Sequence, residues 1–494
     1  MDFEHYYKTM GFDAYPFSVY TAESELDKAE SIYKKPSNHS VIDEALNGCS
    51  VIITGERGTG KTALNLDIMR RKKSDNTLIV RIDEFSKLDE EFDHEQLYEF
   101  ITAQISGAFF KIMSLNPTAF WKYSSDERKY LSMYLHLYVP ASTKSQLRGQ
   151  IKKIQHGISK RTAIWFYNSS RIILNYGLKA ATKIVSDSLT KHFSALPEFD
   201  SGDSEYFKRL DAEIDDSFTP EDRSYYLLEK LCELIGKAKI NDIIVSIDKI
   251  DEDPRFRNDA ERISKFVGGI ASNNKIIING GFKVVLFVWS TPFNMIKSNT
   301  RTQKIVLQPL SWSRRELKEV ADKRISAFSN GKLDDLKLLF DSNAEICINR
   351  IIEMSNENPR DLWHILHQAL VSQFELDSSK KITTDAINAG IDKFVKEFNY
   401  YEYYPRKSNA RADSMDIYSF AKHLIKLDSD EFTKNMLNEK AGTGGSTNKY
   451  VVSMVSMGLI RIKKKIEQGV VIYEIKDPKI RYARQDNIDI STQS

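Results

Sequence analysis

The chain has 494 residues, with 71 lysines and arginines against 69 aspartates and glutamates, which gives a formal net charge of +2. This balance excludes polyanion binding by bulk charge, so contact with nucleic acid would need a local patch. The three cysteines lie far apart without a CxxC pair, which argues against structural zinc and favours a reducing, cytoplasmic location. No apolar run reaches the roughly 18 residues of a membrane-spanning helix, so we expect no membrane contact. The length predicts several domains.

Residues 1–49 form a leader before the first strong motif, SVIITGERGTGKTALNLDIMRRK, at residues 50–72. An apolar run predicts a buried strand at 51–53, and apolar residues at helical spacing predict a helix at 63–71. The intervening residues fit the pattern GxxxxGK[ST] without a mismatch, which predicts a phosphate-binding loop. The alternative is a glycine turn with a surface lysine. We expect contact with the nucleotide at Gly55, Glu56, Arg57, Gly58, Thr59, Gly60, Lys61, Thr62 and Ala63.

The loop predicts particular roles for two of these residues. Backbone N–H groups and the helix N-terminus would hold the α and β phosphates, and Lys61 would reach the β and γ phosphates. The Thr62 hydroxyl would bind Mg²⁺. We therefore expect a nucleoside triphosphate with Mg²⁺ as the bound group.

A second strand is predicted in NTLIVRIDEF, followed by a long stretch, about 90–238, that such a sheet does not need. Apolar residues recur there every three or four positions, which predicts a helical insertion. Within it, KSQLRGQIKKIQHGISKR at 144–161 is basic. This segment is either a solvated helix face or a contact for nucleic acid or an acidic partner.

A carboxylate at the end of another buried strand is expected from DIIVSIDKIDED. Asp248 follows the apolar run at the edge where parallel strands meet a ligand, and we assign it to the Mg²⁺ shell. Asp251 or Glu252 would orient or deprotonate the attacking water, and the sequence does not decide between them. Residues 248–251 superficially resemble the guanine-binding pattern [NT]KxD. The first position does not fit, so we prefer ATP to GTP.

Two more strands complete the predicted sheet, at 283–288 and 304–310. Ser290 follows the first of them and could hydrogen-bond the γ-phosphate or the water, although a polar strand cap before a turn is equally ordinary. Arg301 lies between the two strands, where it could enter a neighbouring subunit's site, or it is simply a surface arginine. Five apolar strands predict an α/β fold with a parallel sheet covered on both faces, over residues 50–310.

Residues 311–400 read as a helical lid, which opens at SWSRRELKEV with Ser313 as the N-cap. The stretch NPRDL places Pro359 at the start of a helix and Arg360 at its base. From there the guanidinium could reach the γ-phosphate and report nucleotide state to the lid. The alternative is a surface ion pair.

Residues 411–494 predict three short helices followed by a hairpin around EQG, the order of a winged helix. Asn448 and Lys449 would begin the recognition helix, and Arg461 and residues 463–465 would line the wing. This module would contact either DNA or protein, because Glu467 and Glu474 dilute its basic charge.

Taken together, the phosphate loop, IDKIDE, the polar-tipped strand, LQPLSWSRRELKEV and NPRDL resemble bacterial P-loop ATPases of the AAA+/STAND group. The resemblance is to the KAP-like and origin-recognition-like branches, and it includes the leader stretch AYPFSVYTAESE. It implies an ATP-driven switch, often oligomeric, with Ser290 in the position called sensor 1. In many bacterial relatives such a switch belongs to anti-phage (antiviral) defence. Lys249 stands where classical members have the catalytic glutamate, which implies slow or partner-stimulated hydrolysis.

The sequence supports two functional hypotheses. In the first, an ATPase switch protein forms homo-oligomers and controls a partner effector protein. In the second, a DNA loader or remodelling ATPase uses the winged helix as its DNA module. A small-molecule phosphotransferase is a weaker third reading, because the sequence offers no acceptor pocket and would leave the lid and winged helix without a purpose.

Overall fold

The computed structural model describes residues 2–18, 21–73, 76–115, 219–278, 281–301, 303–406, 416–466 and 469–490, and a few positions between 122 and 138. Most of the predicted insertion, with its basic stretch 144–161, and Glu467 lie outside the described residues. Among the helices in the described ranges, none has the length and apolar character needed to cross a membrane.

The core of the protein is a five-stranded sheet in which every neighbouring pair is parallel. The strands are β1 (Val51–Gly55), β2 (Thr77–Ile82), β3 (Asp242–Ile247), β4 (Lys283–Trp289) and β5 (Val306–Pro309). Their order is β2-β3-β4-β1-β5, so β4 separates β1 from β3. This confirms the predicted parallel sheet and is compatible with a P-loop-like α/β fold. Because neighbouring strands lie about 4.8 Å apart, the carboxyl ends of β1 and β3 leave a gap about two strand spacings wide.

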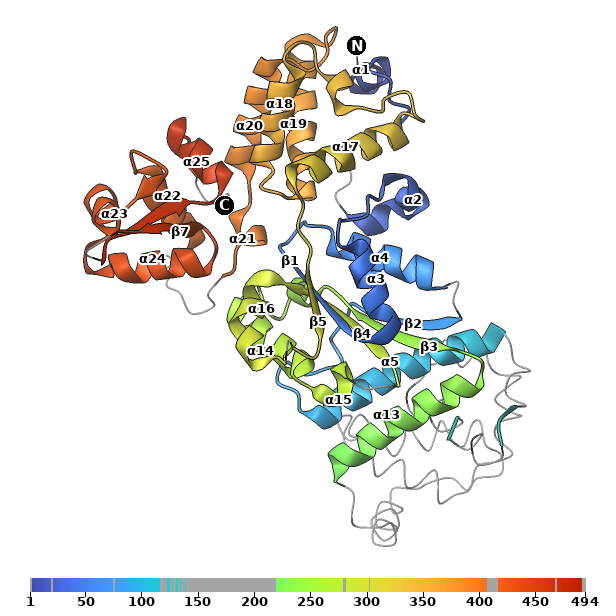
Figure 1. The fold of residues 1–494 in the computed structure, drawn as a ribbon. Helices are drawn as coiled ribbons and strands as arrows, with labels where there is room; N and C mark the ends of the chain where they lie inside the picture. Colours follow the sequence, from blue (N-terminus) through green and yellow to red (C-terminus); the bar gives the residue numbers. More distant parts are fainter. Residues whose placement is uncertain are drawn as a thin grey trace, which may run out of the picture.

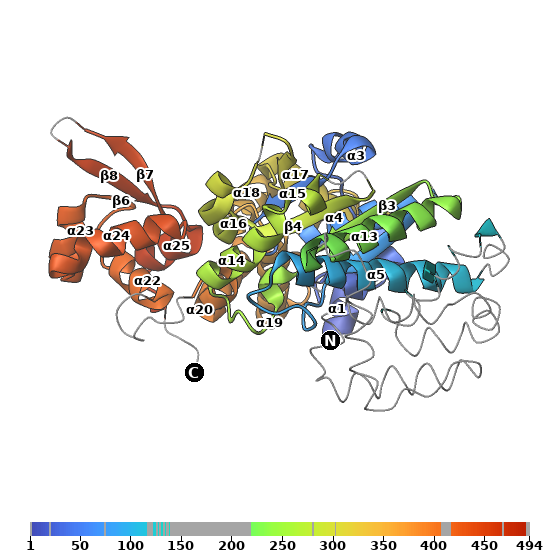
Figure 2. The same ribbon diagram turned by 90° about the horizontal axis from the view of Figure 1, so that it is seen from below.

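The three central strands, β3, β4 and β1, are buried on both faces, as their uninterrupted apolar runs require. Val51 and Ile53 belong to one apolar core and Ile52 to another, because successive side chains of a strand point to opposite faces. One face packs against helices α5 (His94–Leu115), α13 (Pro220–Lys237) and α14 (Ala260–Ala271). Figures 1 and 2 both show α5 and α13 lying side by side. Helices α4 (Lys61–Lys72), α15 (Asn274–Ile277) and α16 (Ser290–Ile296) complete this part of the chain.

The leader is helical and extends from the lid to the sheet. Its elements are α1 (Phe3–Thr9), η1 (Ala22–Lys28), α2 (Ala29–Ile32) and α3 (His39–Gly48). Phe3 packs edge-on against Phe374 of the lid, with 5.4 Å between the centres of the two rings. The Tyr15 hydroxyl lies 2.8 Å from His367 Nδ1. The first part of the leader therefore packs on the lid.

The lid lies above the carboxyl edge of the sheet in Figure 1. It consists of α17 (Arg314–Phe328), η6 (Leu336–Leu339), α18 (Ala344–Met354), α19 (Pro359–Asp377) and α20 (Thr384–Glu397), with α21 (Tyr400–Tyr403) after it. Ser313 caps α17 in a capping box with Glu316, as the sequence predicts for the N-cap. Helices α19 and α20 approach so closely that a Cβ at Gly390 would lie 2.6 Å from the Ala369 nitrogen.

The C-terminal module stands beside the lid (Figure 1). It contains α22 (Ile417–Ile425), α23 (Lys434–Ala441), α24 (Thr447–Ser456) and α25 (Pro478–Gln485). Strands β6 (Glu431–Phe432), β8 (Val471–Ile475) and β7 (Ile460–Lys465) form an antiparallel sheet in that order. The predicted helices and hairpin are present, whereas β6 and α25 are additional elements. The identification of this module as a winged helix stays a prediction.

Candidate functional site

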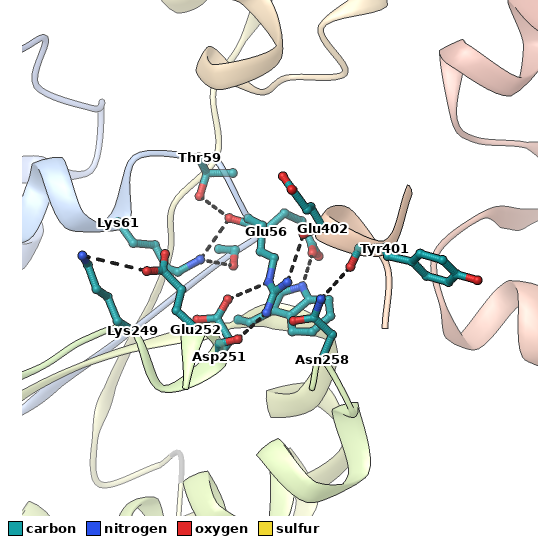
Figure 3. Close-up of polar contacts among 12 residues, drawn as sticks. Glu56, Thr59, Lys61, Lys249, Asp251, Glu252, Asn258, Tyr401 and Glu402 are labelled. Atoms are coloured by element: carbon teal, nitrogen blue, oxygen red, sulfur yellow. Dashed lines mark hydrogen bonds and ion pairs between the residues drawn. The ribbon is translucent and has the colours of Figure 1, made fainter. Parts of the chain in front are cut away.

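A cleft of about 950 Å³ opens where the carboxyl ends of β1 and β3 face the leader and the lid. The phosphate loop, η1, the residues after β3 and the start of α19 line it. Figure 3 shows Lys61, Asp251, Glu252 and Glu402 converging there from different parts of the chain. The sequence predicts a site at this edge of the sheet, and the strand order explains why the cleft has room.

The loop between β1 and α4 has the backbone that its glycines permit. Gly58 and Gly60 have φ angles of +82° and +92°, a region that other residues rarely adopt. A Cβ at Gly58 would also lie 2.4 Å from Asn358 Oδ1, so the lid side chain fits only against a glycine. Gly60 directly precedes α4, whose first residue is Lys61. The loop N–H groups thus lead into a helix N-terminus, the arrangement that favours anions.

Lys61 is buried within the curl of this loop. Its Nζ donates to the carbonyl oxygens of Gly55 and Glu56, each at 3.0 Å. The Thr59 hydroxyl donates to the same Glu56 oxygen at 2.8 Å, and the Trp312 indole donates to the Thr59 carbonyl at 2.8 Å. The ammonium is therefore held by neutral acceptors, which a polyanion would easily outcompete.

Asp248 lies across the gap from the loop, directly after β3, and is 1% exposed. Asn65 Nδ2 donates to its Oδ2 at 3.2 Å, and Ser246 Oγ donates to Asn65 Oδ1 at 2.6 Å. Burial raises the pKa of Asp248, and hydrogen bonds from Asn65 and Thr62 and the charge of Lys61 oppose that rise. The structure therefore brings the two predicted metal ligands, Thr62 and Asp248, together. Asn65, one helical turn after Thr62, was not predicted.

The donor set fits Mg²⁺ and not a fully protein-bound metal. Within the described ranges, no group of three or more His, Cys, Asp or Glu side chains is placed to hold a metal ion. A single carboxylate beside a threonine hydroxyl is instead what Mg²⁺ uses when phosphate oxygens and water supply its remaining ligands. Thr62 and Asp248 would be the protein ligands.

Asp251 and Glu252, between which the sequence could not choose, have different surroundings in the short helix η4 (Ile250–Glu252). Asp251 is buried, with Arg57 Nε at 2.8 Å from its Oδ2. Burial raises its pKa, but the charges of Lys61 and Arg57 outweigh that effect and hold it below the usual value. The Glu252 side chain is 56% exposed, and partial burial and the charge of Asp251 raise its pKa. Glu252 is thus the better placed of the two to take up a proton.

Lys249, the residue directly after Asp248, points toward the leader. Its Nζ lies 2.6 Å from Glu23 Oε1 in η1 and 3.8 Å from Glu252 Oε2. Its φ of +64° places it in the left-handed region. The lysine therefore links the leader to the residues after β3 and holds a positive charge near Glu252.

Arg57 has a side-chain role that the sequence did not indicate. Besides Asp251 Oδ2, its guanidinium donates to the Asp251 carbonyl and, through Nη1, to the Glu402 carbonyl of α21 at 3.0 Å. Its Cζ lies 4.4 Å from the centre of the Trp289 ring, whose Nε1 donates to Glu56 Oε2 at 2.8 Å. One guanidinium thus joins the loop, the residues after β3 and the segment after the lid. No motif signals this contact.

Arg360 is the second residue of α19 and lines the cleft. Asn358 caps this helix, because its Oδ1 accepts from the Arg360 N–H at 3.0 Å. The same side chain donates from Nδ2 to the Arg57 carbonyl at 2.7 Å. The base of the lid helix is therefore hydrogen-bonded to the phosphate loop, which positions Arg360 at the mouth of the cleft.

Four predicted residues are not among those that line the cleft: Gly55, Glu56, Ser290 and Arg301. Ser290 begins α16 just beyond β4 and is not among the lining residues. Arg301 is exposed on the connection between β4 and β5, in a separate hollow with Lys297 and Lys304. Contact of Ser290 with phosphate and of Arg301 with a neighbouring subunit stay predictions.

Comparison with known proteins adds little to this geometry. No family model matches the chain, and no curated protein matches it. Among solved structures, a chain from the structure of Drosophila ORC bound to DNA is 11% identical, with a TM-score of 0.30 over 97% of this chain and 91% of that one. At that TM-score it is a weak structural similarity.

Proposed function

We propose that this chain binds ATP with Mg²⁺ in the cleft and hydrolyses it. The observation that carries the proposal is the placement of Lys61 and Thr62, at the start of α4, opposite the buried Asp248. Loop N–H groups and Lys61 would hold the phosphates, and Thr62 and Asp248 would hold the metal, which would neutralise phosphate charge. Hydrolysis at this site is partner-stimulated or slow in our proposal, because Lys249 occupies the usual place of the base.

Glu252 acts as the general base in this proposal, and Asp251 as the partner of Arg57. The exposure and raised pKa of Glu252 support this assignment, because a base must exchange its proton with water. Arg360 would contribute positive charge at the γ-phosphate from the lid side. The proposal excludes the guanine-binding alternative, since the Asp251 carboxylate is paired with Arg57 and is not available to a guanine ring.

The test compares Lys61→Ala with Lys72→Ala at the other end of the same helix, where Lys72 Nζ bonds Asn47 Oδ1 at 3.0 Å. Binding of a fluorescent ATP analogue with Mg²⁺ is measured by anisotropy. Loss of a charge-assisted contact predicts about 10- to 100-fold weaker binding for Lys61→Ala and no change for Lys72→Ala. Equal affinities of wild type and Lys61→Ala would refute the assignment.

The wider role in this proposal is that of an oligomeric switch that controls a partner effector protein. Arg301 is exposed and therefore accessible to a neighbouring subunit. The effector and a place in bacterial anti-phage defence follow from the resemblance to the AAA+/STAND group alone. A mass measurement in solution with and without ATP tests assembly, and a single chain under both conditions would contradict it.

The DNA-loading alternative finds less support in the C-terminal module. On its hairpin, Arg461 Nη2 lies 2.7 Å from Glu474, and Lys463 Nζ lies 2.5 Å from Glu431. Those pairs neutralise part of the charge that would grip phosphates, so the switch remains the preferred proposal. Salt-sensitive duplex binding that is lost on replacing residues 463–465 would reverse the preference.

A further inference from the structure

The segment that joins the lid to the C-terminal module, residues 399–406, is hydrogen-bonded to the core beside the cleft. Arg57 Nη1 donates to the Glu402 carbonyl at 3.0 Å. Asn258 Nδ2 donates to the Tyr401 carbonyl at 2.7 Å, and the Arg406 N–H donates to the Asn258 carbonyl at 2.9 Å. Figure 3 shows Asn258, Tyr401 and Glu402 together at the edge of the site. The segment thus touches the phosphate loop and the residues that follow Glu252.

The same segment and the C-terminal module are fixed to the lid by a different kind of contact. Lys479 of α25 is fully buried, with its Nζ 3.2 Å from Asp361 Oδ2 and 3.5 Å from Asp477 Oδ1. The Tyr404 hydroxyl donates to the other Asp477 oxygen at 2.6 Å. Separating these charges would leave them buried and unpaired, so this contact favours a lid and C-terminal module that move as one unit.

The two contacts differ in how easily they open. Residues 399–406 are held to the core by hydrogen bonds to backbone carbonyls at the edge of the cleft, and such hydrogen bonds can be replaced by water. The contact between the C-terminal module and the lid is made by buried charges. Since Asp361 directly follows Arg360 in α19, a displacement of the C-terminal module with the lid also displaces Arg360 relative to the cleft.

Arg57 is the side chain on which an incoming nucleotide would act. Its positive charge is neutralised by Asp251 alone among the contacts described, because its other acceptors are the carbonyls of Asp251 and Glu402. A triphosphate brings several negative charges into the same cleft and attracts the guanidinium more strongly than a neutral carbonyl does. The contact with the Glu402 carbonyl is therefore weaker than the ion pair with Asp251 and gives way before it.

We propose that Arg57 is the positioning residue through which occupancy of the cleft reaches the lid and C-terminal module. Without nucleotide it ties residues 399–406 to the core. A bound triphosphate draws its guanidinium off the Glu402 carbonyl and frees the segment. This inference rests on the proposed function for the identity of its ligand. The hydrogen bonds that join residues 399–406 to the core are present without any ligand.

The experiment is amide hydrogen exchange on the full chain, with the Arg406 amide as the reporter because its hydrogen bond crosses from the segment to Asn258. Wild type is compared with Arg57→Gln and with the control Arg315→Ala, an arginine whose side chain is 87% exposed on α17. Without nucleotide, Arg57→Gln is expected to raise exchange at Arg406 about tenfold, and the control to leave it unchanged. If the Arg406 amide of a folded Arg57→Gln variant exchanges as slowly as in wild type, Arg57 does not hold residues 399–406 to the core.

Measurements with nucleotide distinguish a failure of the coupling from a failure of ATP binding. In wild type, a saturating non-hydrolysable ATP analogue with Mg²⁺ is expected to raise exchange at Arg406 as the substitution does. If calorimetry shows that the analogue binds while Arg406 stays protected, the coupling is wrong and the ATP proposal stands. If the analogue does not bind, the ATP proposal and the coupling both fail. Should Arg57→Gln not fold, Arg57→Lys replaces it, because a single ammonium lacks the planar fork whose three separate nitrogens make the hydrogen bonds to Asp251 and Glu402.

Discussion

Two adjacent carboxylates, Asp251 and Glu252, illustrate how environment separates the roles of similar residues. Asp251 is buried against Arg57, and the nearby charges keep its pKa low. Glu252 is half exposed, and burial and the charge of Asp251 raise its pKa. A carboxylate whose charge is already neutralised by an arginine is a poor proton acceptor, whereas one with a raised pKa is a better one. In the proposed function Asp251 therefore holds Arg57 in position, and Glu252 accepts the proton of the attacking water.

Glu252→Gln is predicted to lower kcat about 100-fold or more while ATP affinity stays within about twofold, because the base is removed and the phosphate contacts are kept. Turnover is measured by phosphate release, and Glu261→Gln on α14 serves as the control. The base must be deprotonated to act, so a raised pKa predicts that wild-type kcat falls with decreasing pH at higher pH than an ordinary glutamate would give. That acidic limb should be absent from Glu252→Gln. An unchanged kcat in Glu252→Gln would contradict the assignment.

The residues that the sequence does predict are those whose chemistry depends on local spacing. Lys61 and Thr62 follow from the glycine pattern, and Asp248 follows from its place after an apolar strand. Asn358 and the side chain of Arg57 could not be predicted, because each acts on a residue far away in the chain. Asn65 lies near Thr62 in sequence, but its contact with Asp248 requires the sheet to be formed.

At the scale of elements, strands β1, β3 and β4 are predictable because both faces of each are buried and their apolar runs are continuous. Their order is not, since β1 pairs with β4 and β5, which lie far along the chain. That order decides the function of the site, because it places β4 between the loop strand and the strand that ends at Asp248. The packing of α19 on α20 is a second element-level feature that affects the site, because α19 carries Arg360.

Gly390→Ala is predicted to destabilise the lid by about 1–3 kcal/mol, because its Cβ would lie 2.6 Å from the Ala369 nitrogen and force the helices apart. Urea unfolding followed by circular dichroism measures the change. Gly107→Ala in α5 is the matched control, since a Cβ there meets no atom of the described residues within 4 Å and alanine favours a helix. Equal stabilities of Gly390→Ala and wild type would show that the two helices are not in close contact.

At the scale of the whole molecule, one apolar core runs from a face of the sheet through the lid into the C-terminal module. Val51 and Ile53 of β1, Leu366 of α19 and Leu424 of α22 belong to it. The sequence suggests these parts as separate domains, and nothing in their patterns indicates that they share a core. Charged residues at the junction, above all Lys479, add buried ion pairs to this apolar contact between the C-terminal module and the lid.

Lys479→Met is predicted to cost about 3–5 kcal/mol, because Asp361 and Asp477 would remain buried without their cation. Chemical unfolding gives the free energy, and limited proteolysis is expected to release the C-terminal module at residues 399–406. Lys476→Met, an exposed position three residues earlier, is the control and should change neither measurement. A fully stable, protease-resistant Lys479→Met protein would contradict the role of the cluster.

The central claim is that this cleft holds Mg²⁺ and ATP, and a structure of the protein determined with a non-hydrolysable ATP analogue and Mg²⁺ tests it most directly. We predict the triphosphate against the loop between β1 and α4, with the metal beside Thr62 and Asp248 and Lys61 turned from the Gly55 and Glu56 carbonyls to the phosphates. A structure at saturating analogue in which Lys61 keeps those carbonyls and no phosphate lies on the loop would contradict the account.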